Sequence, residues 1–257
     1  MGTSTGYGMP TGGEWTPLKT DATQFVKNGE NGPISPAKLL RSYLRAHGGA
    51  SGIARGDGGR AQGGAGRRGG GAAGTTGARK VGRNLGSFLS NVGSIGLDGA
   101  LRDVGLAHLV GKSAAEVSAG LLDALSGPGS TLDDHAARIA LAKVNDELFA
   151  GTETYEDVGH ALAEVLDQRG LVHILARFFG YYVYERFCRD FYERWRKRVG
   201  VAQAERSLKS IKDYIESRLK VELIGQNVMQ MNWRGNEGTM LTEQILQDTL
   251  EIFEVTG

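Results

Sequence analysis

Residues 171–198 read LVHILARFFGYYVYERFCRDFYERWRKR, and this stretch decides the fold. It holds nine of the nineteen aromatic residues of the chain, and its first half is apolar on almost every side. Such a pattern predicts one long central helix, buried in a helical core. The stretch is no membrane span, because His173 and Arg177 interrupt it and a span needs about twenty apolar residues.

The rest of residues 81–257 also shows helical spacing of apolar residues, with no alternating strand pattern. Ser113 and Glu116 form the pattern of a capping box at the start of one helix. Interior glycines at Gly82, Gly86 and Gly93 require close packing to justify their cost. We therefore expect an all-α, compact multi-helix domain. The further expected helices cover about 81–95, 97–109, 113–125, 130–149, 155–168, 201–223 and 241–253.

Residues 48–80 read GGASGIARGDGGRAQGGAGRRGGGAAGTTGARK, a stretch with fourteen glycines, no aromatic residue and one large aliphatic residue, Ile53. It cannot bury enough apolar area to offset the entropy of ordering, so we expect a disordered Gly/Arg-rich linker that spans roughly 30 Å. Six basic residues and one acidic residue make it positive, whereas residues 81–257 carry nineteen basic and twenty-five acidic residues.

The first 47 residues are expected to form a short N-terminal module. Residues 1–34 are rich in turn formers and sustain neither a helical nor a strand period. Ser35 and Pro36 then predict the start of a short helix over about 36–46, which Gly48 and Gly49 end. An isolated helix of this length is marginal in water, so its apolar stripe must dock on the body or on a partner.

Few residues carry chemistry. Cys188 is the single cysteine, which excludes an intramolecular disulfide and suits a reducing, cytoplasmic setting; among aromatic neighbours it is expected to be inert. No Walker loop, Rossmann fingerprint, nucleophile elbow or zinc spacing is present. Glu156, His160 and Glu164 share one helix face, but a carboxylate-bridged metal site needs a second such unit, so a solvated face is favoured. We expect no enzyme, no cofactor and no metal.

The Arg-rich linker offers an alternative function. Arg55, Arg60, Arg67 and Arg68 give it the look of an RNA-binding segment, yet such segments interleave aromatic residues that stack on bases. Without them, the linker would attract nucleic acid weakly and with a strong dependence on salt.

The N-terminus is the remaining candidate. Removal of Met1 would expose the amine of Gly2, whose pKa of about 7.7–8.0 leaves a useful fraction neutral and nucleophilic near pH 7. Myristoylation would need Ser or Thr where this chain has Gly6. On composition alone, an ordinary disordered tip is the favoured interpretation.

Together, the opening residues GTSTGYGMPTGGEWTPL at 2–18, the Ser35-Pro36 helix ending at Gly48, the Gly-rich linker and the aromatic helical body resemble the B component of Qat-type bacterial antiphage defence systems. The resemblance implies partners: a P-loop ATPase, a QueC-like enzyme and a TatD-like DNase. It also implies that the QueC-like enzyme activates the carboxylate of a 7-deazaguanine with ATP and joins it to an N-terminal glycine. That glycine is Gly2, or Gly6 or Gly8 if a longer leader is removed.

The leading hypothesis is therefore a non-catalytic adaptor that carries its modifiable glycine on a mobile peptide, with the linker supplying reach. Trp15 and Trp233 are the candidate exposed aromatics for docking a partner, although a buried anchor is the favoured interpretation of either. The alternative is a nucleic-acid-binding accessory protein that acts through the Gly/Arg-rich segment.

Overall fold

The computed structural model describes residues 13–29, 32–55, 74–168, 170–219 and 232–255, and within these ranges every regular element is helical. The expectation of an all-α protein is confirmed. The elements in chain order are α1 (Trp15–Asn28), α2 (Pro36–Ala46), α3 (Gly49–Arg55), α4 (Thr76–Asp103), the 3-10 helix η2 (Ala107–Leu109), α5 (Ala114–Ser126), α6 (Leu132–Leu148), α7 (Tyr155–Gln168), α8 (Gly170–Val199), α9 (Val201–Leu219) and α10 (Asn236–Val255).

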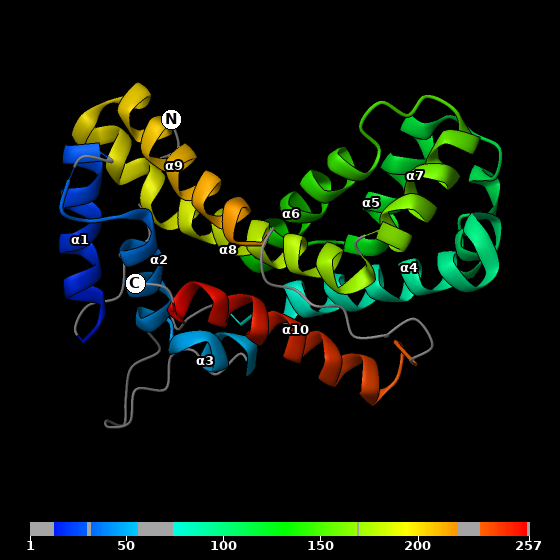
Figure 1. Ribbon diagram of the computed structural model, residues 1–257, viewed down its shortest axis with the longest axis horizontal. Helices are drawn as coiled ribbons and strands as arrows, with labels where there is room; N and C mark the ends of the chain where they lie inside the picture. The colour runs from blue at the N-terminus through cyan, green and yellow to red at the C-terminus, as the bar shows by residue number, and fades with distance from the viewer. Residues whose placement is uncertain (1–12, 30–31, 56–73, 169, 220–231, 256–257) are drawn as a thin grey trace.

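Helix α8 is the spine of an elongated molecule, and α9 returns alongside it (Figure 1). The first half of α8 is buried as the sequence predicts, with Phe178 and Phe179 fully enclosed. Helices α4, α6, α9 and α10 all contact it. Gly180 allows the close approach of α9, because a Cβ at that position would overlap the side chain of Leu219. The long central helix is thus confirmed.

Helices α5, α6 and α7, with the second part of α4, form the end of the molecule opposite α1 (Figure 1). The expected break between two helices falls at Gly96, whose φ of 76° kinks α4. Capping boxes at Ser113 and Thr131 begin α5 and α6. Ile95, which directly precedes the kink, is 59% exposed.

Close packing explains two of the glycines of α4. A Cβ at Gly82 would lie 2.8 Å from the Phe179 ring, and one at Gly86 would overlap the ring of Trp233. Both positions must therefore stay without a side chain for α4 to meet α8 and the segment that precedes α10. The third, Gly93, is exposed on the surface.

Residues 15–28 form helix α1, a helix that the sequence analysis missed. Leu18, Ala22, Phe25 and Val26 are buried, and their spacing places them on one helix face. Threonines and a proline dilute the apolar period, and Pro17 is tolerated because it lies in the first turn. Contacts with α2, α8 and α9 supply the stability that local propensity lacks.

The expected linker of residues 48–80 is too long at both ends. Residues 49–55 form α3, whose Ala50 and Ile53 are buried, and α3 packs on α10. The Ala50 N–H donates to Glu254 at 3.0 Å, and the Thr75 hydroxyl donates to the Ile53 carbonyl at 2.9 Å. Small side chains let α3 approach α10 closely, a tertiary effect that composition does not reveal. The middle of the linker, 56–73, lies outside the described residues.

The N-terminal module does not hang from the linker. Helices α1 and α2 precede the linker and pack on α8, α9 and α10. Residues 15–29 and 32–55 therefore form one packed unit with the body, and the expectation that the linker gives the N-terminal peptide its reach is wrong. The apolar stripe of α2 docks on the body, which was one of the two expected outcomes.

Candidate functional site at the junction of α1, α2 and α8

The described chain enters the fold at the start of α1, where Trp15 lies edge-on against His47 at the end of α2. Their ring centroids are 4.8 Å apart and the rings meet at 62°. His47 is buried and also contacts the Tyr43 ring at 4.3 Å. Trp15 thus covers a buried imidazole and fixes the first turn of α1 on α2.

A polar network beneath this contact ties α2 to the second half of α8. The Tyr43 hydroxyl donates to Asp190 at 2.9 Å, and His47 Nε2 lies 3.8 Å from the same carboxylate. His47 Nδ1 lies 2.9 Å from the Tyr43 carbonyl, which can only accept, so Nδ1 carries the proton in the neutral ring. Arg189 completes the pairing of Asp190.

The network continues along α8 to α6 and α4. Arg186, only 4% exposed, donates to the Tyr182 hydroxyl at 3.3 Å. Tyr182 donates in turn to Asp133, whose other oxygen accepts the Gly77 N–H at 2.7 Å. Residues from α8, α6 and α4 are therefore joined by buried hydrogen bonds, and the charge of Arg186 also acts on Tyr43 and His47 of α2.

Burial dominates the electrostatics of this network. Burial and the nearby Arg186 lower the pKa of His47 to about 4, so the ring is neutral at pH 7. Burial and the Asp190 charge raise the pKa of Tyr43 well above its usual value. Burial raises the pKa of Asp133, against the hydrogen bonds from Tyr182 and Gly77. His47 and Tyr43 are therefore uncharged at pH 7, and they position helices through their contacts.

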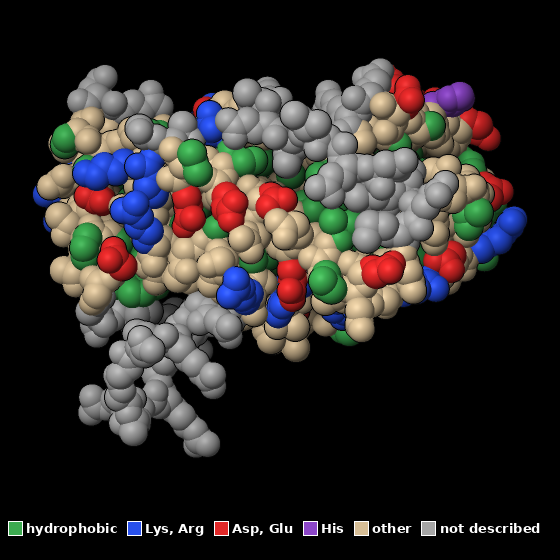
Figure 2. Space-filling view, turned by 60° about the horizontal axis from the view of Figure 1, so that its bottom comes forward, with side chains coloured by type: hydrophobic (Ala, Val, Ile, Leu, Met, Phe, Trp, Pro, Cys, Tyr) green, Lys and Arg blue, Asp and Glu red, His purple; other side chains and the backbone are tan. Residues whose placement is uncertain are grey.

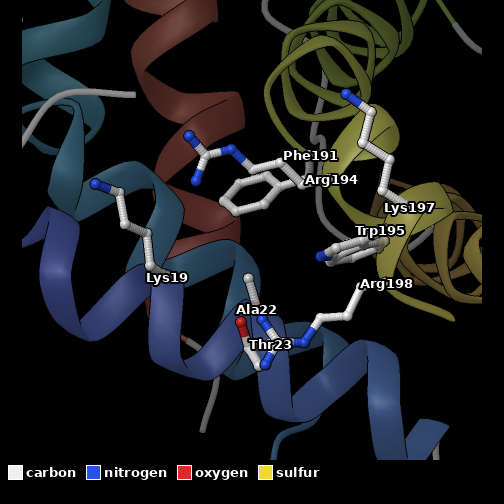
Figure 3. Close-up of a pocket in the computed structure, with 8 residues that line it drawn as sticks. All are labelled: Lys19, Ala22, Thr23, Phe191, Arg194, Trp195, Lys197 and Arg198. Carbon is white, nitrogen blue, oxygen red and sulfur yellow. The ribbon is translucent and has the colours of Figure 1, made fainter. Parts of the chain in front are cut away.

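An open groove lies beside the network, between α1 and the end of α8 (Figure 3). Its volume is about 330 Å³, and its cationic lining residues are Lys19, Arg194, Lys197 and Arg198. Arg198 reaches toward α1, Arg194 extends past the Phe191 ring, and Lys197 points away from them (Figure 3). Basic side chains also gather over the α1 and α2 end of the molecule in Figure 2, while acidic side chains are spread along its length.

The structure places the predicted site residues Gly2, Trp15 and Trp233 in three different situations. Gly2 lies outside the described residues. Trp15 is half-buried against His47 and keeps some exposure. Trp233 is 3% exposed, so its expected role as an exposed docking aromatic is wrong; the space above Gly86 encloses its ring.

The residues weighed as a metal face, Glu156, His160 and Glu164, lie on α7 and are all exposed. Within the described ranges, no group of three or more His, Cys, Asp or Glu side chains is arranged to hold a metal ion. Cys188 is half-buried, and burial raises the pKa of its thiol to about 12, which disfavours the reactive thiolate. None of the described helices combines the length and apolar composition needed to cross a membrane.

Sequence reasoning missed the network, although a signal exists. Tyr182, Arg186 and Asp190 recur every four residues on one face of α8, and Tyr43 and His47 are spaced likewise. Charged residues on a buried helix face require partners, so this spacing marks a polar contact between helices.

Comparison with known proteins identifies the family. The sequence model of the Qat anti-phage system associated protein QatB matches residues 64–253. The match leaves out residues 2–18 and the Ser35-Pro36 helix, on which the resemblance rested. No curated protein and no solved structure matches the chain. Because the match covers more than half of the chain, this protein belongs to the QatB family of the Qat anti-phage system.

Proposed function

We propose that this chain is a non-catalytic subunit of the Qat system that presents an N-terminal glycine to a modifying enzyme. Family membership supports a role in the system. The acceptor is the amine of Gly2, and the donor is a 7-deazaguanine carboxylate activated with ATP by a QueC-like enzyme. An amide bond on Gly2 removes a positive charge and adds a planar group to the terminus.

The observation that carries the proposal is the anchoring of α1. Trp15 is fixed over the buried His47, and Leu18, Ala22 and Phe25 hold the helix on the body. The acceptor glycine therefore lies a dozen residues before a rigid point on the surface. A modifying enzyme that docks on the body near α1 meets the peptide at a high local concentration.

The helical body is the docking platform for the other subunits in this proposal, the P-loop ATPase and the TatD-like DNase. Half-buried Trp15 is the aromatic residue retained as a contact, since it is exposed in part at the start of α1. Aromatic side chains of this kind are frequent anchors at protein interfaces.

Intact mass and N-terminal peptide sequencing test the proposal. Protein produced with the active QueC-like enzyme and its substrates should carry the added mass on the peptide that begins at Gly2, and protein produced without the enzyme should not. Gly2→Ala keeps a small residue after Met1 but adds a Cβ beside the amine, so modification should fall. Gly6→Ala and Gly8→Ala are matched controls that should leave it intact. An unmodified Gly2 amine in the presence of the active enzyme contradicts the proposal.

A further inference from the structure

We propose that the two grooves that flank α1 form a surface that binds the phosphate backbone of nucleic acid. This activity is separate from the proposed modification of Gly2. It also differs from the linker-based alternative, because the residues that carry it belong to packed helices.

The first groove gathers cations from two helices. Lys19 comes from α1, and Arg194, Lys197 and Arg198 come from α8. All three cations of α8 are exposed, and among the described residues none of the three has a carboxylate partner. The neighbouring Arg196, by contrast, is paired with Glu193 at 2.9 Å. Three cations of α8 without carboxylate partners favour an anionic ligand.

Cations in the last turn of a helix also interact favourably with the helix dipole, so the cations of α8 alone do not indicate a ligand. The wall of the groove that α1 forms does. Lys19 and the Thr23 hydroxyl belong to α1 and line the same groove as Arg194 and Arg198. A dipole contribution requires none of this convergence across two helices.

The second groove lies on α9, beside the end of α1. Its volume is about 460 Å³, and Asn28 and Gln203 contribute amide groups to its lining. Arg206 and Ser210 line it as well. Ser207, 4% exposed, also lines it, and its hydroxyl oxygen is buried with no hydrogen-bond partner in the described structure. A buried hydroxyl without a partner is unusual in a folded protein, and one beside a groove is consistent with a ligand there.

The chemistry of the two linings selects the ligand. Cations, hydroxyls and amides are the groups that proteins use to contact phosphate oxygens. One carboxylate, that of Asp213, lines the two grooves, and Lys209 is paired with it at 2.5 Å. An acidic protein surface would need no such set of hydroxyl and amide donors, so the observations favour a phosphate backbone.

The aromatic floor argues against reading of bases. Phe191 and Trp195 line the first groove but are each 2% exposed, because they pack on one another at 5.7 Å. Rings enclosed in this way cannot stack on a base. The surface therefore binds strands with little sequence preference and with strong salt dependence.

Fluorescence anisotropy of the full chain with labelled oligothymidylate of about 20 nucleotides tests this, over a salt series that starts near 50 mM. The double variant Arg194→Gln/Arg198→Gln should bind roughly tenfold more weakly, and the slope of log affinity against log salt should fall by about 1.4. The matched control is Arg102→Gln/Lys112→Gln, which removes the same charge from exposed positions at the far end of the molecule. It should bind within about twofold of the wild type.

Circular dichroism should show that both double variants fold, since all four side chains are exposed. Three outcomes overturn the proposal. The first is no binding at 50 mM salt, and the second is an equal loss in the two double variants. The third is a loss that follows Arg60→Gln/Arg67→Gln/Arg68→Gln in the linker and spares the groove variant. If the wild type binds no oligonucleotide but the groove variant no longer binds another Qat subunit that the wild type binds, the surface belongs to a protein partner instead.

Discussion

The first half of α8 lies among helices on all sides, whereas the second half carries a buried polar network on one face and an open basic groove on another. Apolar contact dominates the first half, where Phe178 and Phe179 are fully enclosed, and the hydrogen bond from Tyr182 to Asp133 lies near its end. In the second half, the charge of Asp190 offsets that of the buried Arg186, and Asp190 accepts a hydrogen bond from Tyr43 of α2. The packing of α1 and α2 there depends on these polar partners. One helix thus provides both the stability of the fold and the attachment of its N-terminal helices.

This difference between the two halves of α8 indicates which positions tolerate substitution. The buried side chains of the first half have no free space around them, because α4, α6, α9 and α10 pack against this helix. The second half has solvent beside it, so cations there can bind a ligand without cost to the core.

Phe179→Ala should lower the free energy of unfolding by about 3–5 kcal/mol, because it leaves a cavity against Gly82 that the enclosing helices cannot fill. Urea unfolding followed by circular dichroism measures this. Tyr192→Ala, at a half-buried position in the second half, is the control and should cost less than half as much. Equal losses would erase the contrast between the two halves.

Asp190→Ala should cost about 2–3 kcal/mol, because it leaves the buried Tyr43 hydroxyl without an acceptor and deprives Arg186 of a nearby negative charge. Tyr43→Phe removes the other partner, and the double variant should lose less than the sum of the two. The exposed Glu193→Ala should change stability by less than about 0.5 kcal/mol. Additive losses would show that Tyr43 and Asp190 act independently.

His47 should make the stability of the wild type depend on pH. Its pKa is about 4 in the folded protein against 6.5 in the unfolded chain, so the unfolded state binds more protons between these values. The contribution is therefore full above about pH 6.5 and is lost as the pH falls toward 4. By pH 5 the loss should reach about 1–2 kcal/mol.

Urea midpoints at pH 7 and pH 5 for the wild type and His47→Gln check this, because the variant lacks the titrating ring. The variant should lose less stability than the wild type over the same interval. Parallel losses in the two proteins would place the pH dependence elsewhere.

The helices from α5 to α9 could be predicted because their signals are local. The capping box at Ser113, the glycines that follow the helices and the dense apolar spacing of α8 each act within a few residues. Helices α1 and α3 could not, because their stability comes from contacts with distant helices. The buried Ala50 and Ile53 of α3, for instance, depend on α10, nearly two hundred residues away.

The candidate site divides in the same way. Trp15 could be singled out from the sequence as an aromatic in a polar segment, but its contact with His47 depends on how α1 and α2 pack. The sequence predicts an exposed Trp233 because this residue also lies in a polar segment. Nothing in the sequence around Gly86 indicates that the Trp233 ring packs against it. The basic groove needs α1 beside α8, and no local pattern brings Lys19 to Arg194.

We propose that the α1 end of this protein presents a glycine for modification. The most direct test is the mass of the N-terminal peptide from protein produced together with its QueC-like partner. We expect a 7-deazaguanine amide on the Gly2 amine, reduced in Gly2→Ala and retained in Gly8→Ala. A free Gly2 amine on protein from cells in which the partner is active would contradict it.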